Sequence, residues 1–115
     1  MGKIQQSGNL VGLVLAVLAD SPLHGYGIAR EIEKRSEDAL SFGEGTLYPA
    51  LKTLEKSEFI VGRWSEAAER GPARKVYEIT PAGIEELARI RLAWSEYSQS
   101  VSRVFRGATT EGTPC

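Results

Sequence analysis

The chain has 115 residues, of which 42% are hydrophobic and 25% are charged, a composition typical of one globular domain and too short for two catalytic domains. Its 14 basic and 15 acidic residues give a formal net charge of -1, which excludes a histone-like protein that binds nucleic acid through bulk positive charge. A single cysteine, Cys115, excludes an intramolecular disulfide and a cysteine-based zinc site.

The N-terminal part predicts a flexible arm, residues 1–9, followed by an amphipathic helix that starts at Asn9 and ends before Asp20-Ser21-Pro22. The apolar positions of this helix cover an arc of about 200°, which is wider than one packing partner needs. We therefore expect a second subunit to cover part of the helix through Leu10, Val11, Val14 and Leu18.

The same helix holds the longest apolar stretch of the chain, residues 10–19. That stretch is well short of the roughly 20 residues that span a bilayer. No basic leader with a cleavage site precedes it. We expect a cytoplasmic protein with no membrane contact.

Two further helices are predicted, over residues 25–36 and up to Ser57, joined by a linker at 37–42. The start of the later helix depends on Pro49, which lacks an amide hydrogen. If Thr46 is the N-cap, Pro49 falls in the first turn, where that hydrogen has no helical partner. A start at Glu44 requires a distorted first turn instead, and both starts remain open.

The remaining predicted elements are a β-hairpin and one long helix. Two β-rich runs, residues 59–65 and 74–80, are joined by a Gly-Pro-containing segment. Thr80-Pro81 then predicts a helix over 81–106, about 39 Å long, followed by a disordered tail at 107–115. Apolar residues along this helix alternate three- and four-residue steps, as in a paired-helix interface: Leu87, Ile90, Trp94, Tyr97, Val101 and Val104.

Three helices followed by a hairpin are the element order of a winged helix-turn-helix. We expect a mainly α fold with a small β-hairpin, in which residues 10–80 form a winged-helix DNA-binding domain and residues 81–106 a C-terminal dimerisation helix. If Leu47, Leu51 and Leu54 are buried, the outer face of the third helix carries hydroxyl and ammonium groups suited to a major groove. The residues on that face are Thr46, Tyr48, Pro49, Lys52 and Lys56.

The hairpin is expected to add basic side chains that suit a phosphate backbone or a minor groove: Arg70, Arg74 and Lys75. Part of this charge is expected to be neutralised by Glu78 or Glu66 across the hairpin. Tyr26, at the start of the second helix, is either a further phosphate contact or a half-buried core aromatic.

Several motifs resemble the PadR-type winged-helix transcriptional regulators, over about residues 10–106. They are PLHGYGI at 22–28, GTLYPALKTLE at 45–55, RKVYEITPAG at 74–83, and Trp94 in the last helix. The resemblance is to the smaller subfamily with a short last helix. This chain departs from the pattern at Ser57-Glu58, where many members have a glycine, and at Thr53, where a second basic residue is common.

The resemblance implies a homodimeric repressor that binds a pseudo-palindromic operator in double-stranded DNA and dimerises through the last helix. It also implies that Tyr48 and Lys52 belong to the recognition helix. Some members hold planar aromatic effectors between subunits near the position of Trp94, so this residue is either an effector contact or a simple interface anchor.

Other functions have less support in the sequence. His24, the only histidine, is expected to cap or pack a helix start, and Trp64 is expected to pack. We predict no enzyme activity, cofactor or metal site, because no nucleophile set, phosphate loop or ligand-spaced cluster is present. The competing interpretation is a winged-helix module that binds another protein instead of DNA, in keeping with the net charge of -1.

Overall fold

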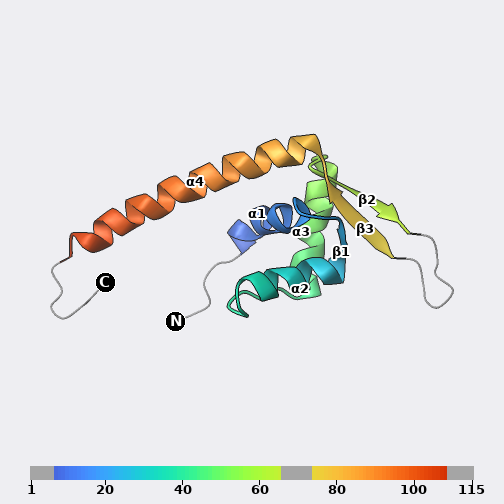
Figure 1. The fold of residues 1–115 in the computed structure, drawn as a ribbon, viewed down its shortest axis with the longest axis horizontal. Coiled ribbons are helices and arrows are strands. Elements are labelled where there is room, and N and C mark those ends of the chain that lie inside the picture. Colours follow the sequence, from blue (N-terminus) through green and yellow to red (C-terminus); the bar gives the residue numbers. More distant parts are fainter. Residues whose placement is uncertain (1–6, 66–73, 109–115) are drawn as a thin grey trace.

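The computed structural model describes residues 7–65 and 74–108 (Figure 1). Residues 1–6, 66–73 and 109–115 lie outside this description, and with them most of the predicted arm, Arg70 and most of the predicted tail. The elements in chain order are α1 (Ser7–Leu18), β1 (Leu23–His24), α2 (Gly25–Arg35), α3 (Glu44–Lys56), β2 (Ile60–Trp64), β3 (Lys75–Ile79) and α4 (Pro81–Arg106). The mainly α winged-helix architecture predicted from the sequence is confirmed.

Helix α1 is the centre of the core, because α2, α3 and α4 all pack against it. Its side chains Leu10, Val14 and Leu18 are at most 2% exposed within the single chain. The prediction that these three residues contact a second subunit is therefore wrong, since their apolar surface is already covered by the chain's own helices. Val11 is only half-buried. The helix also begins at Ser7, two residues before the predicted start.

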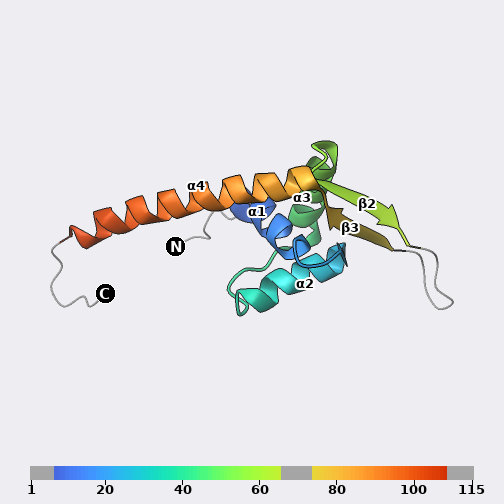
Figure 2. The same ribbon diagram turned by 45° about the horizontal axis from the view of Figure 1, so that its top comes forward.

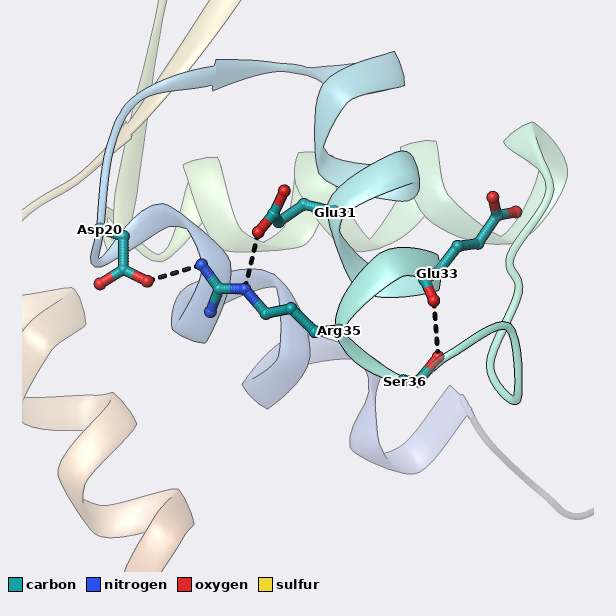
Figure 3. A network of polar contacts seen from close by, with 5 residues as sticks. All are labelled: Asp20, Glu31, Glu33, Arg35 and Ser36. Carbon is teal, nitrogen blue, oxygen red and sulfur yellow. Dashed lines mark hydrogen bonds and ion pairs between the residues drawn. The ribbon is translucent and has the colours of Figure 1, made fainter.

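A polar network joins the C-terminal end of α2 to the turn that follows α1 (Figure 3). The Arg35 guanidinium donates to Asp20 at 2.6 Å and to Glu31 at 2.8 Å, so it joins the end of α2 to the turn that follows α1. Ser36 ends α2 and donates to the Glu33 carbonyl at 3.2 Å. Exposed ion pairs of this kind each contribute little to the free energy of unfolding, so the packing of α2 against α1 does not depend on them.

Helix α3 starts at Glu44 with Gly43 as N-cap, which decides between the two starts left open by the sequence. The amides of Thr46 and Leu47 both donate to the Gly43 carbonyl, at 3.1 and 2.9 Å, so the first turn mixes 3₁₀ and α geometry. Pro49 therefore lies inside the helix.

The end of α3 uses a left-handed residue that is not glycine. Glu58 has φ of 64°, and the amides of Glu58 and Phe59 donate to the carbonyls of Glu55 and Leu54. This is the Schellman arrangement, in which glycine usually occupies the left-handed position. At Ser57-Glu58 the chain therefore forms a Schellman turn with Glu58 at the position where glycine is usual.

A third strand, in addition to the two predicted ones, completes the sheet. β1 pairs antiparallel with β3, which pairs in turn with β2, giving the order β1-β3-β2. The register places His24 opposite Val76. The base of the wing is therefore attached directly to the start of α2.

Thr80 and Gly83 form the joint between the hairpin and α4. The Thr80 hydroxyl donates to the Glu58 carbonyl at 2.8 Å and accepts from the Gly83 amide at 3.0 Å, and the Thr80 amide donates to Phe59 at 3.0 Å. Gly83 is buried so closely that a Cβ there would lie 2.1 Å from the Phe59 carbonyl oxygen. The direction of α4 relative to α3 and the wing is fixed by these contacts.

Beyond this joint, α4 passes α1 and its C-terminal half projects away from the other elements (Figures 1 and 2). The radius of gyration is 17.3 Å. A compact chain of this length would have about 13 Å. Among the described residues, none of the helices combines the length and the apolar character that spanning a bilayer requires.

Candidate nucleic-acid interface

The outer face of α3 is open, as the sequence predicts. Leu47, Leu51 and Leu54 are buried, each at most 2% exposed. The opposite side of the helix exposes all five predicted residues: Thr46, Tyr48, Pro49, Lys52 and Lys56. Their exposure is confirmed, whereas their contact with DNA stays a prediction.

Tyr48 is held in place rather than free. It is 44% exposed, and its hydroxyl lies so near the start of α2 that a Cβ on Gly25 would be 2.9 Å from the hydroxyl oxygen. Only a glycine at position 25 leaves room for this ring. The α2 start therefore positions the Tyr48 hydroxyl at the edge of the α3 face.

Tyr26 is an exposed residue at 63%, which rules out the half-buried core alternative. Its ring stacks on His24 with centroids 6.3 Å apart and an interplanar angle of 3°. Arg30, a residue not predicted to belong to the site, donates to the Tyr26 hydroxyl at 2.9 Å and lies over its ring. The signal for Arg30 was its position one turn after Tyr26 on the same helix face.

Lys75 is paired with Glu55 and not with Glu78, one of its predicted partners. Its ammonium donates to Glu55 of α3 at 3.1 Å and lies 5.5 and 5.9 Å from the rings of Tyr77 and Trp64. Burial raises the pKa of the Tyr77 hydroxyl, and the Lys75 ammonium partly opposes that shift, so Tyr77 is neutral. The charge of Lys75 is thus largely compensated inside the chain.

The other wing residues differ from expectation in part. Arg63, not Lys75 or Arg74, pairs with Glu78, at 3.7 Å. Trp64 was predicted to pack, but it is 68% exposed, and the Lys75 ammonium lies over its ring. Arg74 is exposed, and its terminal nitrogen lies 3.1 Å from His24 Nε2.

These side chains surround an open hollow of about 530 Å³ between the start of α2, the face of α3 and the wing strands. Its lining combines aromatic rings and basic groups: His24, Gly25, Tyr26, Tyr48, Trp64, Arg74, Lys75 and Tyr77. Aromatic surfaces and cations at a concave site suit the sugar-phosphate backbone of a nucleic acid.

A second, apolar region lies on α4. Trp94, Tyr97 and Val104 are 55%, 63% and 73% exposed, whereas Leu87 is buried at 6%. Ile90 and Val101 are half-buried. The predicted paired-helix face is therefore available over its C-terminal part, while Leu87 belongs to the core of the single chain.

Trp94 also borders a groove of about 550 Å³ between α1 and α4. The groove is lined by Asn9, Gly12, Leu13, Ala16, Leu40, Phe42, Leu87, Ile90, Arg91 and Trp94. In the described part of the chain, no group of three His, Cys, Asp or Glu side chains is arranged to hold a metal ion.

The three-helix core, the sheet and the exposed α3 face together define a winged helix-turn-helix protein of the kind that regulates transcription. A model of the PadR-like family of transcriptional regulators matches residues 14–89. The chain therefore belongs to the PadR-like family.

Relatives of known structure or description agree with this assignment. The chain is 34% identical to the transcriptional regulator Rv3488 of Mycobacterium tuberculosis over 88 residues, which cover 76% of this chain and 78% of that protein. A PadR-like transcriptional regulator of Bacillus cereus is 29% identical with a TM-score of 0.74, covering 90% of this chain and 97% of that one. A transcriptional regulator of Clostridium thermocellum is 26% identical with a TM-score of 0.79, covering 85% and 94%.

Proposed function

We propose that this transcriptional regulator is a cytoplasmic, homodimeric repressor that binds a pseudo-palindromic DNA operator. The observation that carries the proposal is the open face of α3, which exposes Tyr48 and Lys52 and on which Tyr48 also lines the aromatic and basic hollow. Each α3 would enter a major groove, and the two copies would reach successive grooves about 34 Å apart.

The net charge of -1 is compatible with DNA binding, because several carboxylates form ion pairs within the chain. Glu55 and Glu78 are paired with basic residues of the wing, and Asp20 and Glu31 are paired with Arg35. Within residues 7–65 and 74–108, no carboxylate lies within ion-pair distance of Lys52 or Lys56. These two ammonium groups are therefore available for phosphates.

The exposed residues of α4 support the homodimer. Trp94, Tyr97 and Val104 lie on one side of a helix whose C-terminal half has no covering element in the described chain. Large exposed apolar patches mark interaction surfaces. A second copy of α4, related by a two-fold axis, offers the same residues in return.

Substitution of Lys52 and Tyr48 tests the DNA contact. Lys52→Ala is expected to weaken binding to all sequences about equally and to lower the slope of log affinity against log salt by about 2, one for each subunit. Tyr48→Phe keeps the ring against Gly25, so a change in site preference would report the hydroxyl alone. Fluorescence anisotropy with selected operator and scrambled duplexes measures both effects.

The matched control is Arg103→Ala, which removes one positive charge at the far end of α4. It is expected to bind DNA like the parent. If Lys52→Ala and Tyr48→Phe also bind like the parent, α3 is not the recognition helix. If the affinity of the parent for DNA hardly depends on salt, the protein-binding alternative is favoured.

We further propose that the groove beside Trp94 takes a planar aromatic effector. Its volume of about 550 Å³ and mainly apolar lining are in the range of small-molecule sites. In a Trp64→Phe background, where Trp94 is the only tryptophan, a planar polycyclic dye is expected to quench the emission and to weaken DNA binding. Quenching that leaves DNA binding unchanged, or no quenching, contradicts an effector role.

A further inference from the structure

His24 and Arg74 meet at the point where the wing joins the start of α2. His24 is the N-cap of α2, and its Nδ1 accepts from the Gly27 amide at 3.2 Å. Its other ring nitrogen, Nε2, lies 3.1 Å from a terminal nitrogen of Arg74. The expectation that His24 caps a helix start is confirmed, but the capping role uses only one side of the ring.

The two contacts of His24 cannot both be hydrogen bonds in one protonation state. A neutral imidazole has one nitrogen that donates and one that accepts, and an arginine only donates. When Nδ1 accepts from the Gly27 amide, Nε2 carries the hydrogen and faces the Arg74 donor. In that tautomer two donors lie side by side, and one external acceptor can bind both of them.

The His24 donor is held rigidly. Its ring is fixed by the Gly27 amide, stacks on Tyr26, and is attached to the wing through the pairing of His24 with Val76. Arg74 is exposed and can adjust. Both residues line the hollow of about 530 Å³, at the N-terminal end of α2, where the helix dipole also favours an anion.

Glu55 of α3 pairs with Lys75, a residue that lines the hollow, at 3.1 Å, so its carboxylate is already compensated. Of the carboxylates that the structure describes, none lies within ion-pair distance of Arg74, and His24 and Arg74 both line the hollow. We propose that His24 Nε2–H and the Arg74 guanidinium together bind one phosphate of the operator backbone. The wing and α2 would then share a single phosphate.

This inference rests on the proposed DNA binding and assigns two of its contacts. It differs from a general attraction of basic groups, because a histidine that donates to phosphate does so through one defined hydrogen bond. It also predicts that Lys75, although basic and on the same strand, contributes less than Arg74.

The test compares the parent with His24→Ser, Arg74→Gln and the double variant. Serine is a good N-cap, so His24→Ser keeps an acceptor for the Gly27 amide while removing Nε2. Each single variant is expected to lose at least about tenfold in operator affinity. Because both groups bind one phosphate, the double variant is expected to lose clearly less than the product of the two single losses.

Two further measurements make the outcome unambiguous. NMR spectra of the ¹⁵N-labelled parent report whether Nε2 of His24 carries the hydrogen. Addition of operator DNA is expected to shift the resonance of that hydrogen. Lys75→Gln is expected to lose less affinity than Arg74→Gln. If His24→Ser does not fold, Arg74→Gln and the ring signals still decide the question.

The possible results separate the inference from the proposed function. If the parent binds no DNA, the proposed function fails. If the parent binds but both single variants match it, or the two losses multiply fully, the shared phosphate is refuted alone. The same NMR experiment is repeated with inorganic phosphate in place of DNA, at the same concentration of phosphate groups. If the resonance of the His24 hydrogen shifts there too, the site binds the free anion, and the assignment to the operator backbone is overturned.

Discussion

Tyr97→Glu is expected to convert the proposed homodimer into single chains and to lower operator affinity by at least about a hundredfold. Tyr97 is 63% exposed in the single chain and lies on the proposed pairing face of α4 beside Trp94, with ring centroids 6.1 Å apart. A carboxylate there would be buried without a partner at the interface, which costs about 3–5 kcal/mol, and a two-fold axis places two of them together.

The loss of affinity follows from the loss of the second half-site. Two linked recognition helices gain about 10² to 10⁴ in affinity over one, provided that the geometry allows both to bind. Sedimentation velocity measures the dimer, and anisotropy with full and half operators measures DNA binding. The variant is expected to bind both duplexes equally.

Gln99→Glu is the matched control. It adds the same charge two residues along the helix, and therefore on the side away from the pairing face. It is expected to remain dimeric. A dimeric Tyr97→Glu protein with parental operator affinity would show that this face of α4 does not pair the subunits.

Gly83→Ala is expected to lower the free energy of unfolding by about 1–3 kcal/mol, because overpacking a rigid site forces the backbone to move. The added Cβ would lie 2.1 Å from the Phe59 carbonyl oxygen and 2.7 Å from Ile79 Cγ1. The backbone oxygen cannot turn aside as a flexible side chain would. Urea denaturation of the parent and the variant measures the difference.

The control for this substitution is Gly45→Ala in α3. A Cβ at Gly45 meets nothing within 4 Å, so the change removes only the conformational freedom of glycine. It is expected to leave the protein equally stable or to stabilise it by up to about 1 kcal/mol. A Gly83→Ala protein as stable as the parent would contradict the tight joint between the hairpin and α4.

Local signals in the sequence were sufficient to predict those elements whose ends are determined by residues near them in the chain. Helix α4 has the predicted bounds, 81–106, because a threonine N-cap followed by proline specifies its start without help from the rest of the chain. The exposed face of α3 also followed from helical spacing alone. The capping role of His24 was predicted for the same reason, since it acts only three residues away.

Features that depend on distant partners could not be predicted in this way. Strand β1 has two residues, too few for an alternating pattern, and it exists because β3 pairs with it. Lys75 is 20 residues from Glu55, its ion-pair partner. The width of the apolar arc on α1 showed that several partners were needed, but not that α2, α3 and α4 would supply them within one chain.

The joint made by Thr80 and Gly83 turns α4 into a lever arm. Because the start of this rod is locked to the carbonyls of Glu58 and Phe59, the wing must follow any change in its tilt. Over a rod of about 39 Å, a tilt of about 5° displaces the opposite end by about 3 Å, comparable with the rise of one base pair. If two copies of α4 pair as proposed, a modest change at their contact would therefore be enough to move the two α3 helices out of register with successive major grooves.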